Sequence, residues 1–157
     1  MIEYIENLLV SYGLSQSMVS YTSVIIAALF IVFISALVYL LAKNILLRII
    51  RAFIEKSRTK LGEALLKNKV FERIIYIIPA FLIHSFAPVF PSYQVWIQRI
   101  AFSYMVLVFV AALSKLLDAA DDVYRSFEVS KSRPIKGYLQ VLKIIAYVIG
   151  TIVIIAV

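Results

Sequence analysis

An uncharged apolar segment decides the fold of this chain: Tyr21-Thr-Ser-Val-Ile-Ile-Ala-Ala-Leu-Phe-Ile-Val-Phe-Ile-Ser-Ala-Leu-Val-Tyr-Leu-Leu-Ala42. A helix of this length, rising about 1.5 Å per residue, crosses the roughly 30 Å hydrocarbon core of a bilayer. The rest of the chain matches, because 63% of its 157 residues are hydrophobic and only 16% are charged. One soluble domain of this size could not bury so much apolar surface. The sequence therefore predicts an all-α integral membrane protein.

The chain contains four segments that are apolar enough to be transmembrane helices. The second is short and contains Pro79, which should kink it because proline lacks the amide hydrogen of the helical ladder. Together the spans and their connections form one predicted membrane domain over residues 21–157. The predicted spans are residues 21–42, 74–89, 95–117 and 138–157.

Two kinds of polar or amphipathic segment flank these spans. Residues 1–20 form a predicted N-terminal amphipathic segment, whose apolar residues share one helical face and which should lie on the bilayer surface. The helical pattern also continues past the first span, with basic residues opposite an apolar face, and past the third span over residues 118–127. Residues 59–68 are expected to be a short polar connection.

The net charge of +7 is concentrated in the two loops that follow the first and third spans. Basic residues stay on the cytoplasmic side, so the N-terminus is predicted outside and the connections inside, outside and inside in turn. The location of the basic residues in cytoplasmic loops accounts for the net positive charge, so nucleic-acid binding is not expected. The loop residues are Lys43, Arg48, Arg51, Lys56, Arg58, Lys60, Lys67, Lys69 and Arg73, and then Lys115, Arg125, Lys131, Arg133 and Lys136.

Two titratable residues lie within predicted spans. His84 is the only histidine and sits near the outer end of the second span, where it is either a pH sensor or a helix-packing residue. Arg99 lies about a turn and a half inside the third span, close enough to the outer boundary to snorkel. Both are therefore candidate intramembrane polar sites.

Catalytic and metal-binding signatures are missing from the sequence. The chain has no cysteine and a single histidine, so no metal site and no cofactor are expected. No phosphate-binding loop or Ser-His-Asp arrangement is present, and we expect neither enzyme activity nor a small-molecule substrate. Asp118, Asp121 and Asp122 form a carboxylate cluster that could act as a metal or acid–base group. The simpler interpretation is that they pair with Lys115, Arg125 or Lys131.

The C-terminal stretch carries a basic turn, Arg133-Pro-Ile-Lys-Gly137, directly into an apolar helix that continues to Val157. No polar flank or aromatic belt follows Val157, whereas spanning helices normally close with interfacial anchors. We therefore expect this chain to be the membrane-embedded part of a longer protein.

Three segments resemble the N-terminal membrane region of the MscS-like mechanosensitive channel family, and within it the YbdG-type (miniconductance) branch. They are Asn68-Lys-Val-Phe-Glu-Arg73, Leu113-Ser-Lys-Leu-Leu-Asp118 and Pro134-Ile-Lys-Gly-Tyr-Leu-Gln-Val-Leu-Lys-Ile145. The third is the most specific, with Pro, Lys-Gly, Gln and a second Lys at fixed offsets. The similarity covers most of residues 57–157. The family's pore helix and cytoplasmic β-domain are absent from this chain.

The resemblance implies a homo-oligomer, heptameric in the family, in the bacterial inner membrane. It would open under bilayer tension and release ions and osmolytes on hypo-osmotic shock. These spans would be the tension-sensing paddle, with Arg48, Arg51, Lys56 and Arg58 contacting lipid headgroups. The turn containing Arg133, Pro134, Lys136 and Gly137 would link the paddle to the pore helix. The alternative from the same composition is a non-conducting membrane anchor or scaffold for a soluble domain.

Overall fold

The computed structural model describes residues 16–57, 59–127 and 135–157, and all its regular elements are helical. The predicted amphipathic segment lies mostly outside these residues. Four of the described helical segments are long and apolar enough to cross a membrane, which confirms the all-α membrane fold. The elements are α2 (Gln16–Ser57), α3 (Lys60–Lys67), α4 (Val70–Ile75), α5 (Ile77–Phe86), η1 (Ala87–Val89), α6 (Gln94–Arg125) and α7 (Lys136–Ala156).

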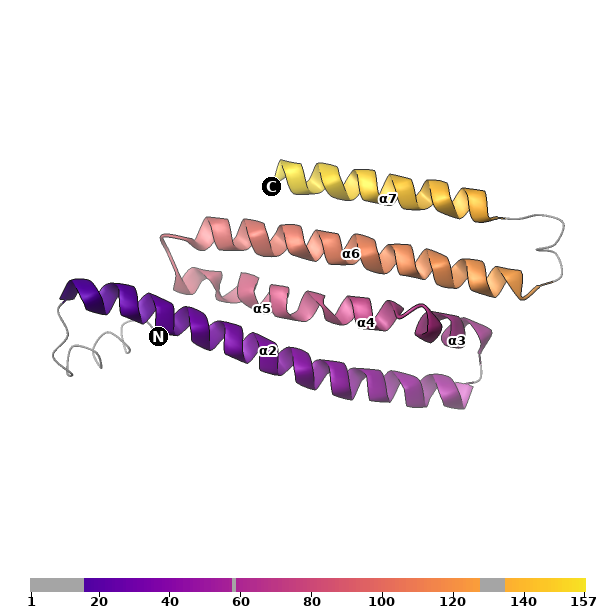
Figure 1. The fold of residues 1–157 in the computed structure, drawn as a ribbon, viewed down its shortest axis with the longest axis horizontal. Helices are drawn as coiled ribbons and strands as arrows, with labels where there is room; N and C mark the ends of the chain where they lie inside the picture. The colour runs from indigo at the N-terminus through magenta and orange to yellow at the C-terminus, as the bar shows by residue number, and fades with distance from the viewer. Residues whose placement is uncertain (1–15, 58, 128–134) are drawn as a thin grey trace.

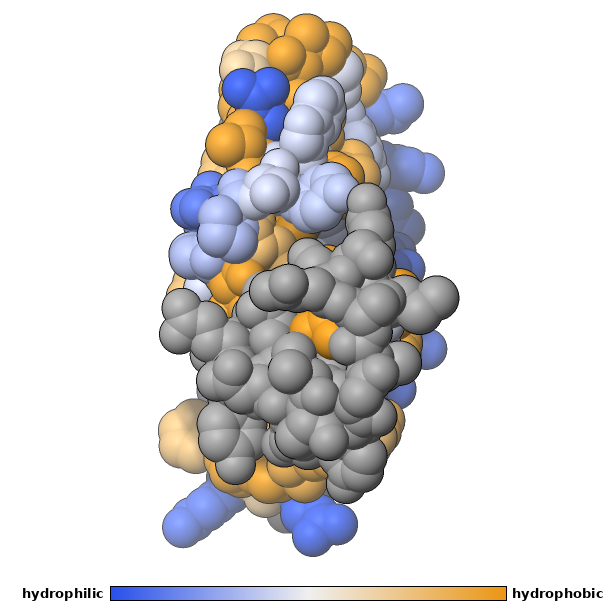
Figure 2. Space-filling view, turned by 90° about the vertical axis from the view of Figure 1, so that its left-hand side faces the viewer, coloured by the Kyte–Doolittle hydropathy of each residue, from blue (hydrophilic) through white to orange (hydrophobic). Residues whose placement is uncertain are grey.

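The helices lie side by side in one layer, each antiparallel to the next (Figure 1). The order across the layer is α2, then α4 and α5, then α6, then α7, and the main contacts follow this order. Viewed along the helices, the molecule is taller than it is wide, with apolar side chains at its top and both apolar and hydrophilic side chains at its bottom (Figure 2). The C-terminal ends of α2 and α6 lie at the same end of the layer as α3 (Figure 1). We call it the basic end, because the last turns of these helices contain Lys56, Arg125 and Lys67.

Helix α2 is continuous over 42 residues, about 63 Å, or twice what the hydrocarbon core requires. It begins at Gln16, so part of the predicted N-terminal segment belongs to it. The expected polar connection after it is instead mainly helix α3, and that expectation was wrong. The local sequence explains the helix: Thr59 is its N-cap, and the Thr59 hydroxyl accepts a hydrogen bond from the Gly62 amide at 3.3 Å.

The second span is interrupted at Tyr76, between α4 and α5. Pro79 explains this break, because it cannot donate a hydrogen bond to the Ile75 carbonyl four residues earlier and its ring crowds that carbonyl. The span starts at Val70, earlier than the predicted residue 74. Lys69, immediately before it, has a left-handed backbone with φ of 56°.

Helix α6 runs without interruption from Gln94 to Arg125, which confirms that the third span continues past residue 117. Helix α7 follows and packs against α6 alone among the main contacts. Gly150 is the buried residue of α7, and a Cβ at that position would lie 2.6 Å from Val110 Cγ2 of α6. The glycine therefore permits the close approach of these two helices.

Small residues fill much of the buried interior of this layer, while many large apolar residues are exposed. Ser23, Ala27 and Ala119 are at most 2% exposed, whereas Phe53 is 74% exposed and Ile155 is 80% exposed. This distribution is the reverse of that in a soluble protein, and it suits helices whose outer surfaces are in contact with lipid.

Candidate functional site

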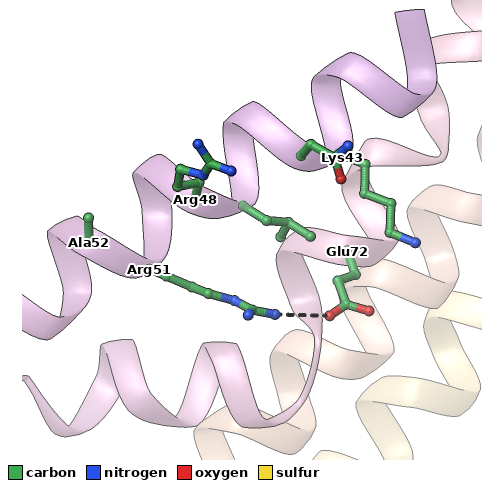
Figure 3. A pocket seen from close by; sticks show the side chains of 7 residues that line it. Lys43, Arg48, Arg51, Ala52 and Glu72 are labelled. Carbon is green, nitrogen blue, oxygen red and sulfur yellow. Dashed lines mark ion pairs between the residues drawn. The ribbon is translucent and has the colours of Figure 1, made fainter. Parts of the chain in front are cut away.

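A hollow of about 590 Å³ lies between α2 and α4 at the basic end, on the predicted inner side of the first span. Arg48 and Arg51 are three residues apart on α2, and Lys43 lies eight residues, about two turns, before Arg51, so all three line the hollow. Glu72 faces them from α4 (Figure 3). The remaining lining residues are Asn44, Leu47 and Ala52.

The hollow has a positive charge, because three cations line it and only one carboxylate does. The Arg51 guanidinium reaches across to Glu72, with Nη2 4.0 Å from Oε1 (Figure 3). Neither Lys43 nor Arg48 forms an ion pair with a described acid. Arg48 and Arg51 are both exposed at the surface of the hollow, so an anion could approach them directly.

The residues predicted to contact headgroups divide into three groups. Arg48 and Arg51 meet in the hollow. Lys56 lies exposed in the last turn of α2, outside the hollow, and Arg58 lies outside the described residues. The prediction missed Lys43 as a lining residue, although its spacing of eight residues from Arg51 places both on one helical face. It also missed Glu72, since only tertiary contact brings α4 to α2.

An apolar groove of about 270 Å³ lies between α2 and α5, farther along the layer from the basic end. Tyr39 of α2 stacks on Tyr76, the residue at the α4–α5 break, with ring centroids 5.5 Å apart. The Lys43 ammonium lies 5.9 Å from the Tyr39 ring centre, so this tyrosine is close to both the groove and the basic hollow. The groove residues are Val32, Ser35, Ala36, Tyr39, Tyr76, Pro79 and Ile83.

The acidic residues at the end of α6 act as connections between helices. Asp118 forms ion pairs with Lys143 of α7 and, at 3.4 Å, with Lys115 of its own helix. Asp122 accepts hydrogen bonds from Lys67 at 3.0 Å and from the Asn68 amide at 2.9 Å. These contacts tie α6 to α7 on one side and to α3 on the other.

The prediction that the carboxylate cluster forms ion pairs is confirmed for two of the three expected partners. Lys115 pairs with Asp118, and Arg125 pairs with Asp121 at 2.9 Å. Lys131 lies outside the described residues. Lys143, an unexpected partner, comes from the apolar helix α7. Within the described part of the chain, no group of three His, Cys, Asp or Glu residues is placed to hold a metal ion.

The two candidate intramembrane residues lie at the end of the layer opposite the basic end. His84 is half-buried in the last turn of α5, where its backbone carbonyl accepts a hydrogen bond from the Ala87 amide. Arg99 is exposed in the second turn of α6. Neither lines the basic hollow, so they do not extend that site.

The predicted linker is only partly described. Lys136 and Gly137 open α7 and are both exposed, whereas Arg133 and Pro134 lie outside the described residues. A Cβ at Gly137 would meet nothing within 4 Å, so no close approach requires glycine there.

No protein-family model, curated protein or solved structure matches this chain, so the family resemblance rests on its three sequence segments alone.

Proposed function

We propose that this chain is the membrane region of an MscS-like mechanosensitive channel that bilayer tension opens. The channel would be a homo-oligomer, heptameric as in that family, with its N-terminus outside the bacterial inner membrane. Its opening would release ions and osmolytes on hypo-osmotic shock. The three sequence segments suggest this function, and one structural feature supports it.

That feature is the single-layer arrangement of the four candidate spans. A ligand or a force shifts an equilibrium only if it distinguishes the two states, and tension favours the state that occupies more membrane area. A flat layer of lipid-facing helices changes its membrane area when it tilts or moves sideways. Such a layer is suited to sensing tension, whereas a compact bundle exposes less of its surface to lipid.

In this proposal the basic end contacts the headgroups of the inner leaflet. Arg48, Arg51, Lys56 and Arg58 each attract anionic lipid by about 1 kcal/mol. These contacts would couple the lipid to α2, and α2 in turn contacts α4 and α5. The segment with Arg133, Pro134, Lys136 and Gly137 would transmit the movement to a pore helix.

Patch-clamp recording under stepped suction tests the function. In this proposal the pore helix is not part of the chain, so the chain is reconstituted in giant liposomes within a longer natural protein that carries it. We expect unitary currents that appear at a reproducible tension. The Arg48→Gln/Arg51→Gln double variant should shift that tension, while Lys56→Gln should shift it less. Silence up to the lytic tension, with insertion verified, would instead favour the membrane anchor.

A further inference from the structure

The basic hollow has room and charge for more than one phosphate group. Its lining of Lys43, Arg48, Arg51 and Glu72 combines three cations with one carboxylate, which leaves a net charge of +2. A lipid headgroup with one phosphodiester would neutralise only half of this charge. We propose that the hollow binds an inner-leaflet phospholipid that carries two phosphodiester groups.

The positions of the cations support two phosphate subsites. Arg51 is directed toward Glu72 on α4, while Arg48 lies on α2 away from that pair (Figure 3). Lys43 is about two turns from Arg51 along the same helix, and its ammonium lies over the Tyr39 ring. In this proposal one phosphate contacts Arg48, and the second contacts Lys43. The hollow, at about 590 Å³, can hold both.

The neighbouring apolar groove favours a lipid over a soluble diphosphate. The groove between α2 and α5 begins where Tyr39 stacks on Tyr76, one turn beyond Lys43 on α2. An acyl chain that enters this groove leaves its headgroup beside the hollow. A soluble polyphosphate would gain nothing from the groove, since its lining is almost entirely apolar.

This inference rests on the proposed headgroup role of the hollow, but it does not require that the chain conducts ions. Native mass spectrometry of the purified protein, in a detergent that retains lipid, measures its affinity for cardiolipin, for phosphatidylglycerol and for inorganic pyrophosphate. Cardiolipin should bind more tightly than two equivalents of phosphatidylglycerol. Lys43→Gln and Arg48→Gln should each weaken cardiolipin binding about fivefold, the effect of one basic residue near a membrane surface.

Two further variants separate binding from folding. Glu72→Gln should tighten cardiolipin binding about fivefold, because it removes the negative charge of the hollow. A misfolded protein would not show this opposite effect. Lys60→Gln, a matched control in α3 at the same end of the layer, is exposed and does not line the hollow, so it should change the affinity little.

The outcomes differ for each part of the proposal. Equal binding of cardiolipin and phosphatidylglycerol would overturn the two-phosphate inference and leave the headgroup role intact. Pyrophosphate binding that equals cardiolipin binding would overturn the assignment to a lipid. A loss of binding in Lys60→Gln as large as in Arg48→Gln would remove the hollow as the site. Channel currents are a separate readout, so their absence would affect only the proposed function.

Discussion

At the scale of single residues, the local structure at two positions favours glycine over any larger residue. Gly150 lies where α7 touches Val110 of α6, with no room for a Cβ. Lys69 has a left-handed backbone conformation that costs a non-glycine residue roughly 1–2 kcal/mol. At each position the structure predicts whether a substitution raises or lowers the stability of the protein.

Gly150→Ala should destabilise the protein by about 1–3 kcal/mol, because its methyl group would overlap the Val110 side chain and force α6 and α7 apart. The matched control is Gly137→Ala in the same helix, where a Cβ meets nothing and the change should be neutral or slightly stabilising. Unfolding in a titration of denaturing detergent, followed by the fluorescence of the single tryptophan, Trp96, measures both. Equal stability of the two variants would contradict the close contact.

Lys69→Gly should stabilise the protein by about 1 kcal/mol, because glycine adopts the left-handed conformation without steric cost. Arg73→Gly, four residues later in the interior of α4, should instead destabilise it by about 1 kcal/mol. The same unfolding titration compares the pair. If both glycines destabilise the protein equally, the left-handed assignment at Lys69 is wrong.

At the scale of elements, the attachment of α7 to the layer depends mainly on α6. Gly150 of α7 lies against Val110 of α6, and one interhelical ion pair, Lys143–Asp118, joins the two helices. Asp118 also holds Lys115, so its carboxylate keeps a partner when Lys143 moves away. Loss of the interhelical pair therefore leaves the Asp118 carboxylate paired, and Lys143 is the group that loses its partner.

Asp118→Asn should loosen α7 relative to α6, because the amide has no charge to hold Lys143. The natural chain has no cysteine, so spin labels at Leu116 and Tyr138, both exposed, report the distance between these helices without background labelling. Double electron–electron resonance in nanodiscs should show a broader and longer distance distribution for the variant.

The matched control for that variant is Asp121→Asn, whose carboxylate pairs with Arg125 of its own helix. It should leave the distance distribution of α6 and α7 unchanged. The proposed attachment of α7 fails if Asp118→Asn has the same narrow distribution as the natural chain.

At the scale of the whole molecule, charge and aromatic residues lie at opposite ends of the layer. Lys56 is in the last turn of α2 at the basic end, while Tyr93 and Trp96 flank the start of α6 at the other. The positive-inside rule predicts that the basic end is cytoplasmic. This orientation also places the proposed lipid site in the inner leaflet.

A cysteine introduced at Tyr93 should react with a membrane-impermeant maleimide on intact cells, because Tyr93 is exposed at the predicted outer end. A cysteine at Lys56 should react only after the membrane is permeabilised. Gel-shift detection of the labelled protein measures both. The reverse pattern would invert the orientation and move the basic hollow to the outer leaflet.

The sequence by itself determined the class, the number of spans and the main interruption. An uncharged segment of membrane length can be identified from its composition alone. Pro79 interrupts the second span through a local steric effect. Arg48 and Arg51 could likewise be assigned to the same helical face from the sequence, because they are three residues apart on one helix. These properties depend on residues that are neighbours along the chain.

Only the tertiary structure decided which helix faces meet, and therefore the single layer, the place of Glu72 opposite Arg51, and the pairing of Lys143 with Asp118. In a soluble protein the apolar face of a helix marks its buried side. Here lipid and protein interior are equally apolar, so large hydrophobic residues point both ways, and small buried ones such as Ala27, Ala119 and Gly150 let the helices approach closely. Hydrophobic periodicity thus carries little information about packing in a membrane, and the order of the helices follows from contacts between residues far apart in sequence.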